Sequence, residues 1–98
     1  MVLISVKVLK EFWEQNPDSK SALQKWAAEV KEADWNSFSD VRNHFNSADY
    51  VGNGRVVFNI KGNQLRIVAL VIYRVRTVFV RFIGTHNSYD KITDIQYI

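Results

Sequence analysis

RVVFNIKGNQLRIVALVIY, residues 55–73, is the stretch of the chain that predicts its fold. In its first part Val56, Phe58 and Ile60 alternate with polar or smaller residues, which is the period of two typical of a half-buried β-strand. Gly62-Asn63 is a two-residue connection of the kind found in tight hairpins. The rest of the stretch is therefore predicted to run antiparallel to the first strand.

The second strand spans residues 64–73, and its continuously apolar centre, Ile67 to Ile72, is typical of a middle strand that is covered on both faces. A third strand is predicted from about residue 76 to residue 83 and completes an antiparallel meander. A loop is predicted at residues 43–54, which are rich in Asn, Ser, Asp and Gly. The remaining predicted elements are a short strand at residues 2–4, a helix that Pro17 must end, a helix with an apolar face from Ala22 to Ala33, a helix from Phe38 to Phe45 and a helix from Thr85 through Ile92.

Helices followed by a meander predict an α+β protein, with N-terminal helices packed on a small antiparallel sheet and a short C-terminal helix. A chain of 98 residues, 47% of them hydrophobic, is expected to form one domain, residues 1–98. Without cysteine there are no disulfides and no thiolate metal sites, which fits a cytoplasmic location. The longest apolar run has seven residues, whereas a membrane helix needs about twenty, so no membrane partner is expected.

Charge is unevenly distributed along the chain. Residues 1–49 carry six basic and eight acidic side chains, for a net charge of −2, whereas residues 50–98 carry seven basic and two acidic ones, for a net charge of +5. No carboxylate lies between Tyr50 and Tyr89, and five of the six cations there are arginine. Planar guanidinium groups suit phosphate, so the pattern favours a polyanionic partner, with a merely solvated basic surface as the alternative.

Strand register gathers several of these cations on one face. If the first turn is Gly62-Asn63, Asn59 lies opposite Arg66. If the next connection is the two-residue loop Arg74-Val75, Val68 lies opposite Arg81, whereas a slip of one residue would bury that arginine unpaired. The chain that leaves the third strand then passes close to Arg66. The predicted cluster consists of Asn59, Lys61, Arg66, Arg81 and His86.

Several cations and one titratable imidazole on the same strip of sheet indicate a place to bind and cut a phosphodiester. Plainer interpretations exist for single residues: His86 as a capping residue, Asn59 and Asn63 as turn residues, Tyr89 as a core aromatic and Lys91 as a solvated cation. The two histidines lack metal-ligand spacing, and neither a metal nor another cofactor is predicted.

Three segments resemble the HigB toxin family of bacterial type II toxin-antitoxin systems: VFNIKGNQLRIV at residues 57–68, RFIGTH at 81–86 and YDKI at 89–92. The resemblance covers nearly the whole chain. It implies a RelE-like fold and an mRNA interferase, an endoribonuclease that commonly cuts mRNA under translation on the ribosome. It also implies neutralisation by a HigA-type antitoxin with a helix-turn-helix domain.

Matched by position, the family motifs imply functional roles for eight residues. The sequence departs from the usual pattern at Ser88, where relatives often carry Glu, which weakens any role for a carboxylate there. The implied catalytic residues are His86, Arg66, Arg81, Lys61 and Tyr89, and the implied RNA-binding residues are Asn59, Asn63 and Lys91. Arg55, a cation of the same basic stretch that precedes the motifs, is also predicted to bind RNA.

The expected reaction needs no metal: the ribose 2′-OH attacks the adjacent phosphorus and leaves a 2′,3′-cyclic phosphate and a 5′-OH. Arg66 and Arg81 would neutralise the charge that builds on the phosphorane oxygens, and His86 would carry the proton, with help from Lys61 or Tyr89. Two alternatives remain open. One is a ParE-like toxin that inhibits DNA gyrase without being an enzyme, and the other is a passive RNA-binding module.

Overall fold

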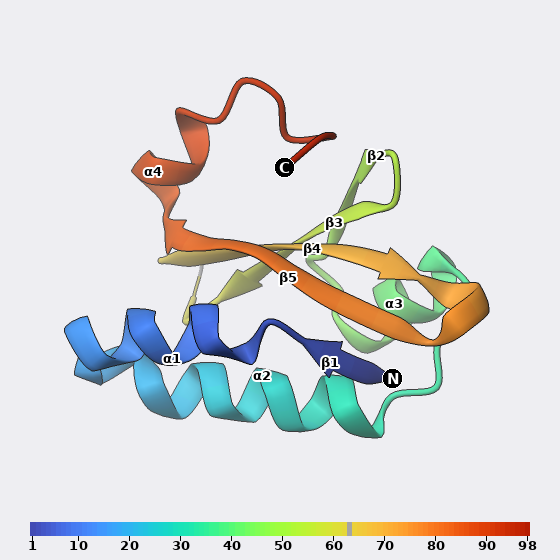
Figure 1. The fold of residues 1–98 in the computed structure, drawn as a ribbon, viewed down its shortest axis with the longest axis horizontal. Coiled ribbons are helices and arrows are strands. Elements are labelled where there is room, and N and C mark those ends of the chain that lie inside the picture. Colours follow the sequence, from blue (N-terminus) through green and yellow to red (C-terminus); the bar gives the residue numbers. More distant parts are fainter. Residues whose placement is uncertain (63) are drawn as a thin grey trace.

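The computed structural model describes residues 1–62 and 64–98. Five strands form one mixed sheet in the order β1-β5-β4-β3-β2 (Figure 1). The strands are β1 (Val2–Ile4), β2 (Asp49–Gly52), β3 (Arg55–Ile60), β4 (Leu65–Ile72) and β5 (Thr77–Thr85). The α-helices are α1 (Val6–Gln15), α2 (Lys20–Glu32), α3 (Phe38–His44) and α4 (His86–Asp90). Single 3₁₀ turns, η1 (Pro17–Ser19) and η2 (Tyr73–Val75), connect α1 to α2 and β4 to β5. The predicted α+β class is confirmed.

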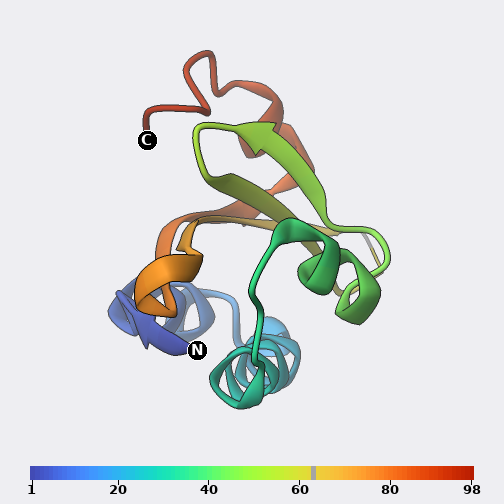
Figure 2. The same cartoon turned by 90° about the vertical axis from the view of Figure 1, so that its right-hand side faces the viewer.

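The helices α1 and α2 lie side by side against one face of the sheet, as Figures 1 and 2 show. Pro17 ends the first helix as predicted, because it cannot donate an intrahelical hydrogen bond: α1 stops at Gln15 and the chain continues as η1. In α2 the buried side chains are Leu23, Trp26, Ala27 and Val30, so the apolar face predicted from their spacing is the face that packs on the sheet.

The hydrophobic core fills the space between this helical layer and the sheet. The ring of Trp26 meets the ring of Phe58 edge to face, with 5.2 Å between centroids, and both side chains are almost fully buried. Val56, Phe58 and Ile60 all belong to the core, which confirms the alternation read from β3. Core packing therefore fixes which side chains β3 turns away from the helices.

The opposite side of the sheet, which we call the outer face, carries Asn59 and Arg66 of the predicted site. Strand pairing arranges its side chains in rows across β3, β4, β5 and β1. The rows are Asn59, Arg66 and Gly84; Val57, Val68 and Phe82; Arg55, Leu70, Phe79 and Ile4; and Ile72, Thr77 and Val2. The predicted pairing of Asn59 with Arg66 is confirmed.

Two strand relationships differ from the prediction. A four-residue strand, β2, pairs with β3 inside the segment predicted to be a loop. In addition, β1 runs parallel to β5, so the sheet is not purely antiparallel. Both pairings involve short strands at the two edges of the sheet, where local sequence patterns are weak.

The two turns also differ from the prediction. Ile60 pairs with Leu65, so Lys61 and Gln64 are not paired as predicted and already belong to the connection, and Lys61 has a left-handed φ of 54°. The prediction that Asn63 is part of a two-residue loop lies outside the described residues. Between β4 and β5, Ile72 pairs with Thr77, so the connection has four residues and not two.

The longer connection is symmetrical about Arg74-Val75, so the predicted register holds from Ile72 opposite Thr77 to Ala69 opposite Val80, and it shifts only beyond that point. Val68 lies opposite Phe82 and not opposite Arg81, and the register changes between Val68 and Ala69. Arg81 is the extra residue of a β-bulge between Val80, which is in the core, and Phe82. The bulge lets Arg81 stay exposed although the predicted pairing is wrong by one residue.

Candidate functional site

Arg66 is the centre of the candidate site. It lies on the outer face of β4 between Asn59 of β3 and Gly84 of β5. Its guanidinium carbon is 5.1 Å from the centroid of the Tyr89 ring, a cation–π contact. The Nε atom of Arg66 is buried and has no hydrogen-bond partner among the described residues. The guanidinium is thus held in place by an aromatic ring while part of its donor capacity is unused.

The start of α4 positions the imidazole of His86. The Thr85 side chain caps the helix by accepting a hydrogen bond of 3.2 Å from the backbone N–H of Ser88, which confirms the predicted cap. His86 is the first residue of α4, and Tyr89 follows three residues later, on a neighbouring position of the helix surface. Because Tyr89 touches Arg66, α4 brings the imidazole to the end of the outer face where Arg66 lies.

The imidazole has a carboxylate partner. His86 Nδ1 is 2.8 Å from Asp90 Oδ2, and the two side chains are 50% and 54% exposed. A proton held on Nδ1 and donated to Asp90 leaves Nε2 free to exchange a proton with a ligand. Asp90 is not among the site residues predicted from the sequence. The four-residue spacing between His86 and Asp90 in a predicted helix is the signal that could have found it.

Gly84 lets α4 lie close to the sheet beside Arg66. A Cβ atom on Gly84 would be 2.7 Å from Cζ of Phe82 and 3.3 Å from Cβ of Ser88. The first distance is shorter than real contacts of this kind. The absence of a side chain at Gly84 is therefore what allows Phe82 and the first turn of α4 to pack where they do.

Lys61 is turned away from this site. Its Nζ is 2.7 Å from Asp18 Oδ2, at the end of the helical layer, and it lines a cleft with Phe12 of α1. The hydrogen bond from Lys61, together with its charge, holds the pKa of the Asp18 carboxyl below its usual range. The predicted common face of Asn59, Lys61 and Arg66 is wrong for Lys61, because strand alternation ends at Ile60 and the backbone turns at Lys61.

Arg55 also has a partner within the chain. Its Nε and Nη2 donate hydrogen bonds of 3.2 and 2.8 Å to the main-chain oxygen of Ile98, and Nη1 donates one of 2.9 Å to Asn53 O. The structure therefore does not bring Arg55 together with Arg66, although both are on the outer face.

The other predicted site residues differ in their exposure and in whether their polar atoms already have a hydrogen-bond partner. Asn59 donates from Nδ2 to Ser47 O at 2.9 Å, and its buried Oδ1 has no partner among the described residues. Lys91 is exposed just after α4. Arg81 is exposed on the bulge, one row from Arg66. Asn63 lies outside the described residues.

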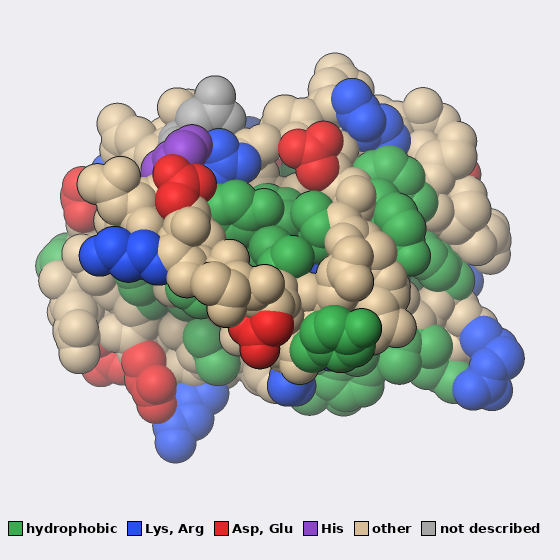
Figure 3. Space-filling view, turned by 90° about the horizontal axis from the view of Figure 1, so that it is seen from above, with side chains coloured by type: hydrophobic (Ala, Val, Ile, Leu, Met, Phe, Trp, Pro, Cys, Tyr) green, Lys and Arg blue, Asp and Glu red, His purple; other side chains and the backbone are tan. Residues whose placement is uncertain are grey.

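Figure 3 looks onto this side of the molecule. Hydrophobic side chains occupy its centre, and basic, acidic and histidine side chains surround them. The part of the chain that the structure describes contains no group of three or more His, Asp or Glu side chains that could hold a metal ion. It also contains no helix long and apolar enough to cross a membrane.

A fixed guanidinium, a half-exposed imidazole with a carboxylate partner and a phenol ring can bind an anion and move a proton beside it. Comparison with known proteins identifies the family of the chain. Residues 19–92 match the family model of the HigB toxin, described as a RelE-like toxic component of a toxin-antitoxin system.

Curated relatives match almost the full chain. The mRNA interferase toxin HigB of Escherichia coli strain K12 is 31% identical over 98 residues, which is 97% of this chain and 93% of the relative. The mRNA interferase HigB of Shigella flexneri matches with the same values. That of Escherichia coli O6:H1 is 30% identical over 95 residues, 95% of this chain and 92% of the relative. The chain therefore belongs to the HigB toxin family, the RelE-like toxic components of toxin-antitoxin systems.

Proposed function

We propose that this chain is an mRNA interferase that cuts mRNA at the Arg66 end of the outer face. The observation that carries the proposal is the cation–π contact between Arg66 and Tyr89 next to the hydrogen-bonded His86 and Asp90. Membership of the HigB family supports it, as do relatives named mRNA interferases. Residues 1–98 would act as one toxin domain.

The proposed reaction is an internal transfer at phosphorus. The ribose 2′-oxygen forms a bond to the adjacent phosphorus, the bond from phosphorus to the 5′-oxygen breaks, and the products carry a 2′,3′-cyclic phosphate and a 5′-OH. Nε2 of His86 accepts the 2′-OH proton and then gives it to the departing 5′-oxygen, and Asp90 keeps the imidazole oriented for both transfers. General acid-base catalysis of this kind contributes about 10²–10⁴-fold to the rate. The 2′-oxygen is the nucleophile, so the proposed reaction needs no metal-bound water.

Arg66 is the residue proposed to neutralise the phosphorane oxygens. A fixed donor aimed at developing negative charge contributes roughly 3–4 kcal/mol in a site that excludes water. Tyr89 lies against the guanidinium and is proposed to act as a positioning residue for Arg66. Arg81 and Lys91 are exposed near the site and would contact neighbouring phosphates.

The proposed partners are translated mRNA, the ribosome and a HigA-type antitoxin with a helix-turn-helix domain, and the proposed location is the cytoplasm. These follow from the family resemblance. The basic second half of the sequence, residues 50–98 with a net charge of +5, supports a nucleic-acid substrate.

The test is primer extension on an mRNA translated in vitro with the purified chain. We expect new 5′-OH ends, and we expect them to persist in a metal chelator. His86→Ala is expected to lower the cleavage rate by about 10²-fold or more. His44→Ala is the matched control, because His44 ends α3 beside Glu29 and Trp35 and lies outside the proposed site. Melting curves establish that both variants are folded.

Three results would contradict the proposal. Cleavage by folded His86→Ala at the wild-type rate would remove the imidazole from the mechanism. Loss of cleavage in chelator would require a metal. RNA binding without new ends, or gyrase inhibition without RNA cleavage, would instead favour a passive RNA-binding module or a ParE-like toxin.

A further inference from the structure

The half of the outer face that lies away from α4 is mostly apolar. Apart from Arg55, which is bonded to Ile98, and the buried Thr77, its two rows consist of Val2 and Ile4 of β1, Phe79 of β5, and Leu70 and Ile72 of β4. We call these five residues the apolar half. Val2 is 56% exposed and Ile4 41%, and Val75 in the adjoining connection is 46% exposed. Large aliphatic side chains exposed together on a sheet face indicate a surface that another molecule covers.

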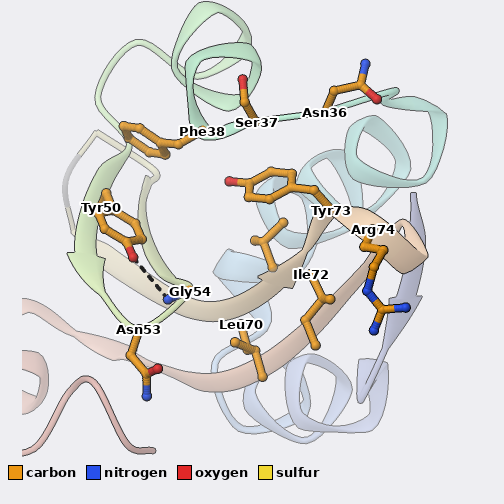
Figure 4. Close-up of a pocket in the computed structure, with 11 residues that line it drawn as sticks. Asn36, Ser37, Phe38, Tyr50, Asn53, Gly54, Leu70, Ile72, Tyr73 and Arg74 are labelled. Carbon is orange, nitrogen blue, oxygen red and sulfur yellow. Dashed lines mark hydrogen bonds between the residues drawn. The ribbon is translucent and has the colours of Figure 1, made fainter.

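A cavity of about 630 Å³ continues this surface. Leu70 and Ile72 line it from the sheet, and the rings of Phe38, Tyr50 and Tyr73 surround it (Figure 4). Figure 4 shows the Tyr73 hydroxyl pointing across the cavity towards Phe38 and Tyr50. The cavity is large enough for a bulky side chain, and its walls are mostly hydrocarbon.

The chain covers other parts of the outer face itself but does not cover the apolar half. Residues 91–98 run back from α4 above the sheet (Figure 1). They are fixed to the β2–β3 hairpin by bonds from Asn53 to Gln96 O and from Gln96 to Val51 O, both 2.9 Å, and by Arg55. This cover ends at β3, so it leaves the exposed side chains of β1 open.

Charge at the margin of the apolar half indicates the chemistry of the molecule that covers it. Arg74 and Arg81 are exposed, and neither forms an ion pair within the described part of the chain, whereas Arg76 is paired with Asp34. Residues 50–89 contain no carboxylate. A complementary partner is therefore apolar at its centre and acidic at its edges.

RNA and a second copy of this chain fit these features less well. Aliphatic side chains such as Val2 and Ile4 offer no aromatic face on which a base could stack. A second copy would bring the same unpaired arginines against Arg74 and Arg81, and like charges oppose such contacts.

We propose that an acidic, amphipathic segment of the antitoxin docks on the apolar half and places a bulky apolar side chain in the cavity lined by Tyr50 and Tyr73. This inference rests on membership of a toxin-antitoxin family and on the exposed surface, and it does not depend on the nuclease assignment. Binding at this surface leaves His86 outside the contact, because α4 lies at the other end of the outer face.

The experiment measures the dissociation constants of the toxin for the purified products of the reading frames that flank its gene. Ile4→Glu and Val75→Glu each add a negative charge to an exposed position in or beside the apolar half. Tyr97→Glu is the matched control, because Tyr97 is 74% exposed and belongs to the segment that follows α4. We expect Ile4→Glu and Val75→Glu to weaken antitoxin binding by about tenfold or more, and Tyr97→Glu to leave it nearly unchanged.

RNA cleavage and melting curves of the same variants complete the test. We expect all three variants to stay folded and to cut RNA like the unmodified chain. Equal binding by all three, or binding by no flanking product, would overturn the proposal. A loss of cleavage in folded Ile4→Glu and Val75→Glu would also overturn it, because the surface would then be part of the RNA site. A dimer of the unmodified chain that these changes dissociate would overturn it too, because a second copy would then cover the surface. If the unmodified chain cuts no RNA, the nuclease proposal fails, but the dissociation constants still test the proposed docking of the antitoxin.

Discussion

Replacing Arg66 by methionine should separate the activity of this toxin from its stability. Methionine keeps most of the length of the arginine side chain and can stay against the Tyr89 ring, but it removes the charge and every donor. Arg66 Nε is buried without a partner, and its guanidinium is 5.1 Å from the Tyr89 centroid. The change therefore removes one unfavourable and one favourable contribution to the free energy of unfolding.

The two contributions can be compared. A buried donor without a hydrogen bond costs about 1–3 kcal/mol, and this cost disappears in Arg66→Met. The lost cation–π contact contributed about 0.5–1 kcal/mol at a partly exposed site. The free energy of unfolding should therefore stay the same or rise by up to about 2.5 kcal/mol. The cleavage rate should fall by about 10²–10³-fold, the usual effect of removing one donor to a developing oxyanion.

Urea denaturation gives the stability, and primer extension on translated mRNA gives the rate. Arg74→Met is the matched control, because Arg74 is exposed and lies at the other end of β4, so cleavage should persist in this variant. A fall of more than about 1 kcal/mol in the free energy of unfolding of Arg66→Met would show that Arg66 is a structural residue whose donor is not desolvated. Cleavage at the unmodified rate would refute its role at the phosphate.

Three further predictions concern the surroundings of the site. Asp90→Asn should lower the steady-state cleavage rate by about tenfold. This is much less than the ~10⁴-fold seen for a buried carboxylate, because solvent also reaches the half-exposed pair of His86 and Asp90. Lys61→Met should leave cleavage rates nearly unchanged, because Lys61 is bound to Asp18. The pKa of Asp18 is lowered in the folded chain, so its pair with Lys61 contributes fully to stability above the ordinary pKa of 3.8. That contribution is lost as the pH falls through the lower pKa of the folded chain. Melting curves of Asp18→Asn and of the unmodified chain should therefore converge in acid. Gly84→Ala should lower the free energy of unfolding by about 1–3 kcal/mol and slow cleavage, because the added Cβ lies 2.7 Å from Cζ of Phe82, whose ring must move, and 3.3 Å from Cβ of Ser88, which presses on the first turn of α4; an unchanged melting temperature would contradict this.

Local patterns were enough to predict the helices and the first hairpin. Pro17 and the apolar spacing in α2 determine where two helices lie, and the alternation in β3 determines its core face. The turn after β3 is longer than predicted by one residue on each side. That change is symmetrical, so it preserves the pairing of Asn59 with Arg66. The central residue of the candidate site was predictable for this reason.

Other positions depend on contacts that the local sequence does not encode. The β4–β5 connection contains no Gly or Asn, and Arg76 takes the left-handed conformation there, with a φ of 54°. The sequence therefore contains no signal for the length of this connection. Nor does it contain one for the bulge at Arg81 or for the strand register beyond the bulge. Arg55 meets Ile98 and Lys61 meets Asp18, and each pair is 43 residues apart in the chain. The sequence shows which residues are cations, but only these long-range contacts show which of them are already paired within the chain and which are free to bind RNA.

The two proposed surfaces share strand β4, and their separation limits how the antitoxin can inhibit the toxin. Arg66 and Leu70 lie on the same face of β4 four residues apart, which is about 13 Å at a rise of 3.3 Å per residue. The Debye length at physiological ionic strength is about 8 Å, so acidic groups bound at the apolar half would be largely screened from the phosphate site. Neutralisation by charge alone is therefore weak at this distance. The body of the antitoxin beyond the docked segment must obstruct the approach of the message or of the ribosome. An isolated docking peptide competes with RNA only at Arg81, so it should bind the toxin while leaving most of the cleavage of a short RNA.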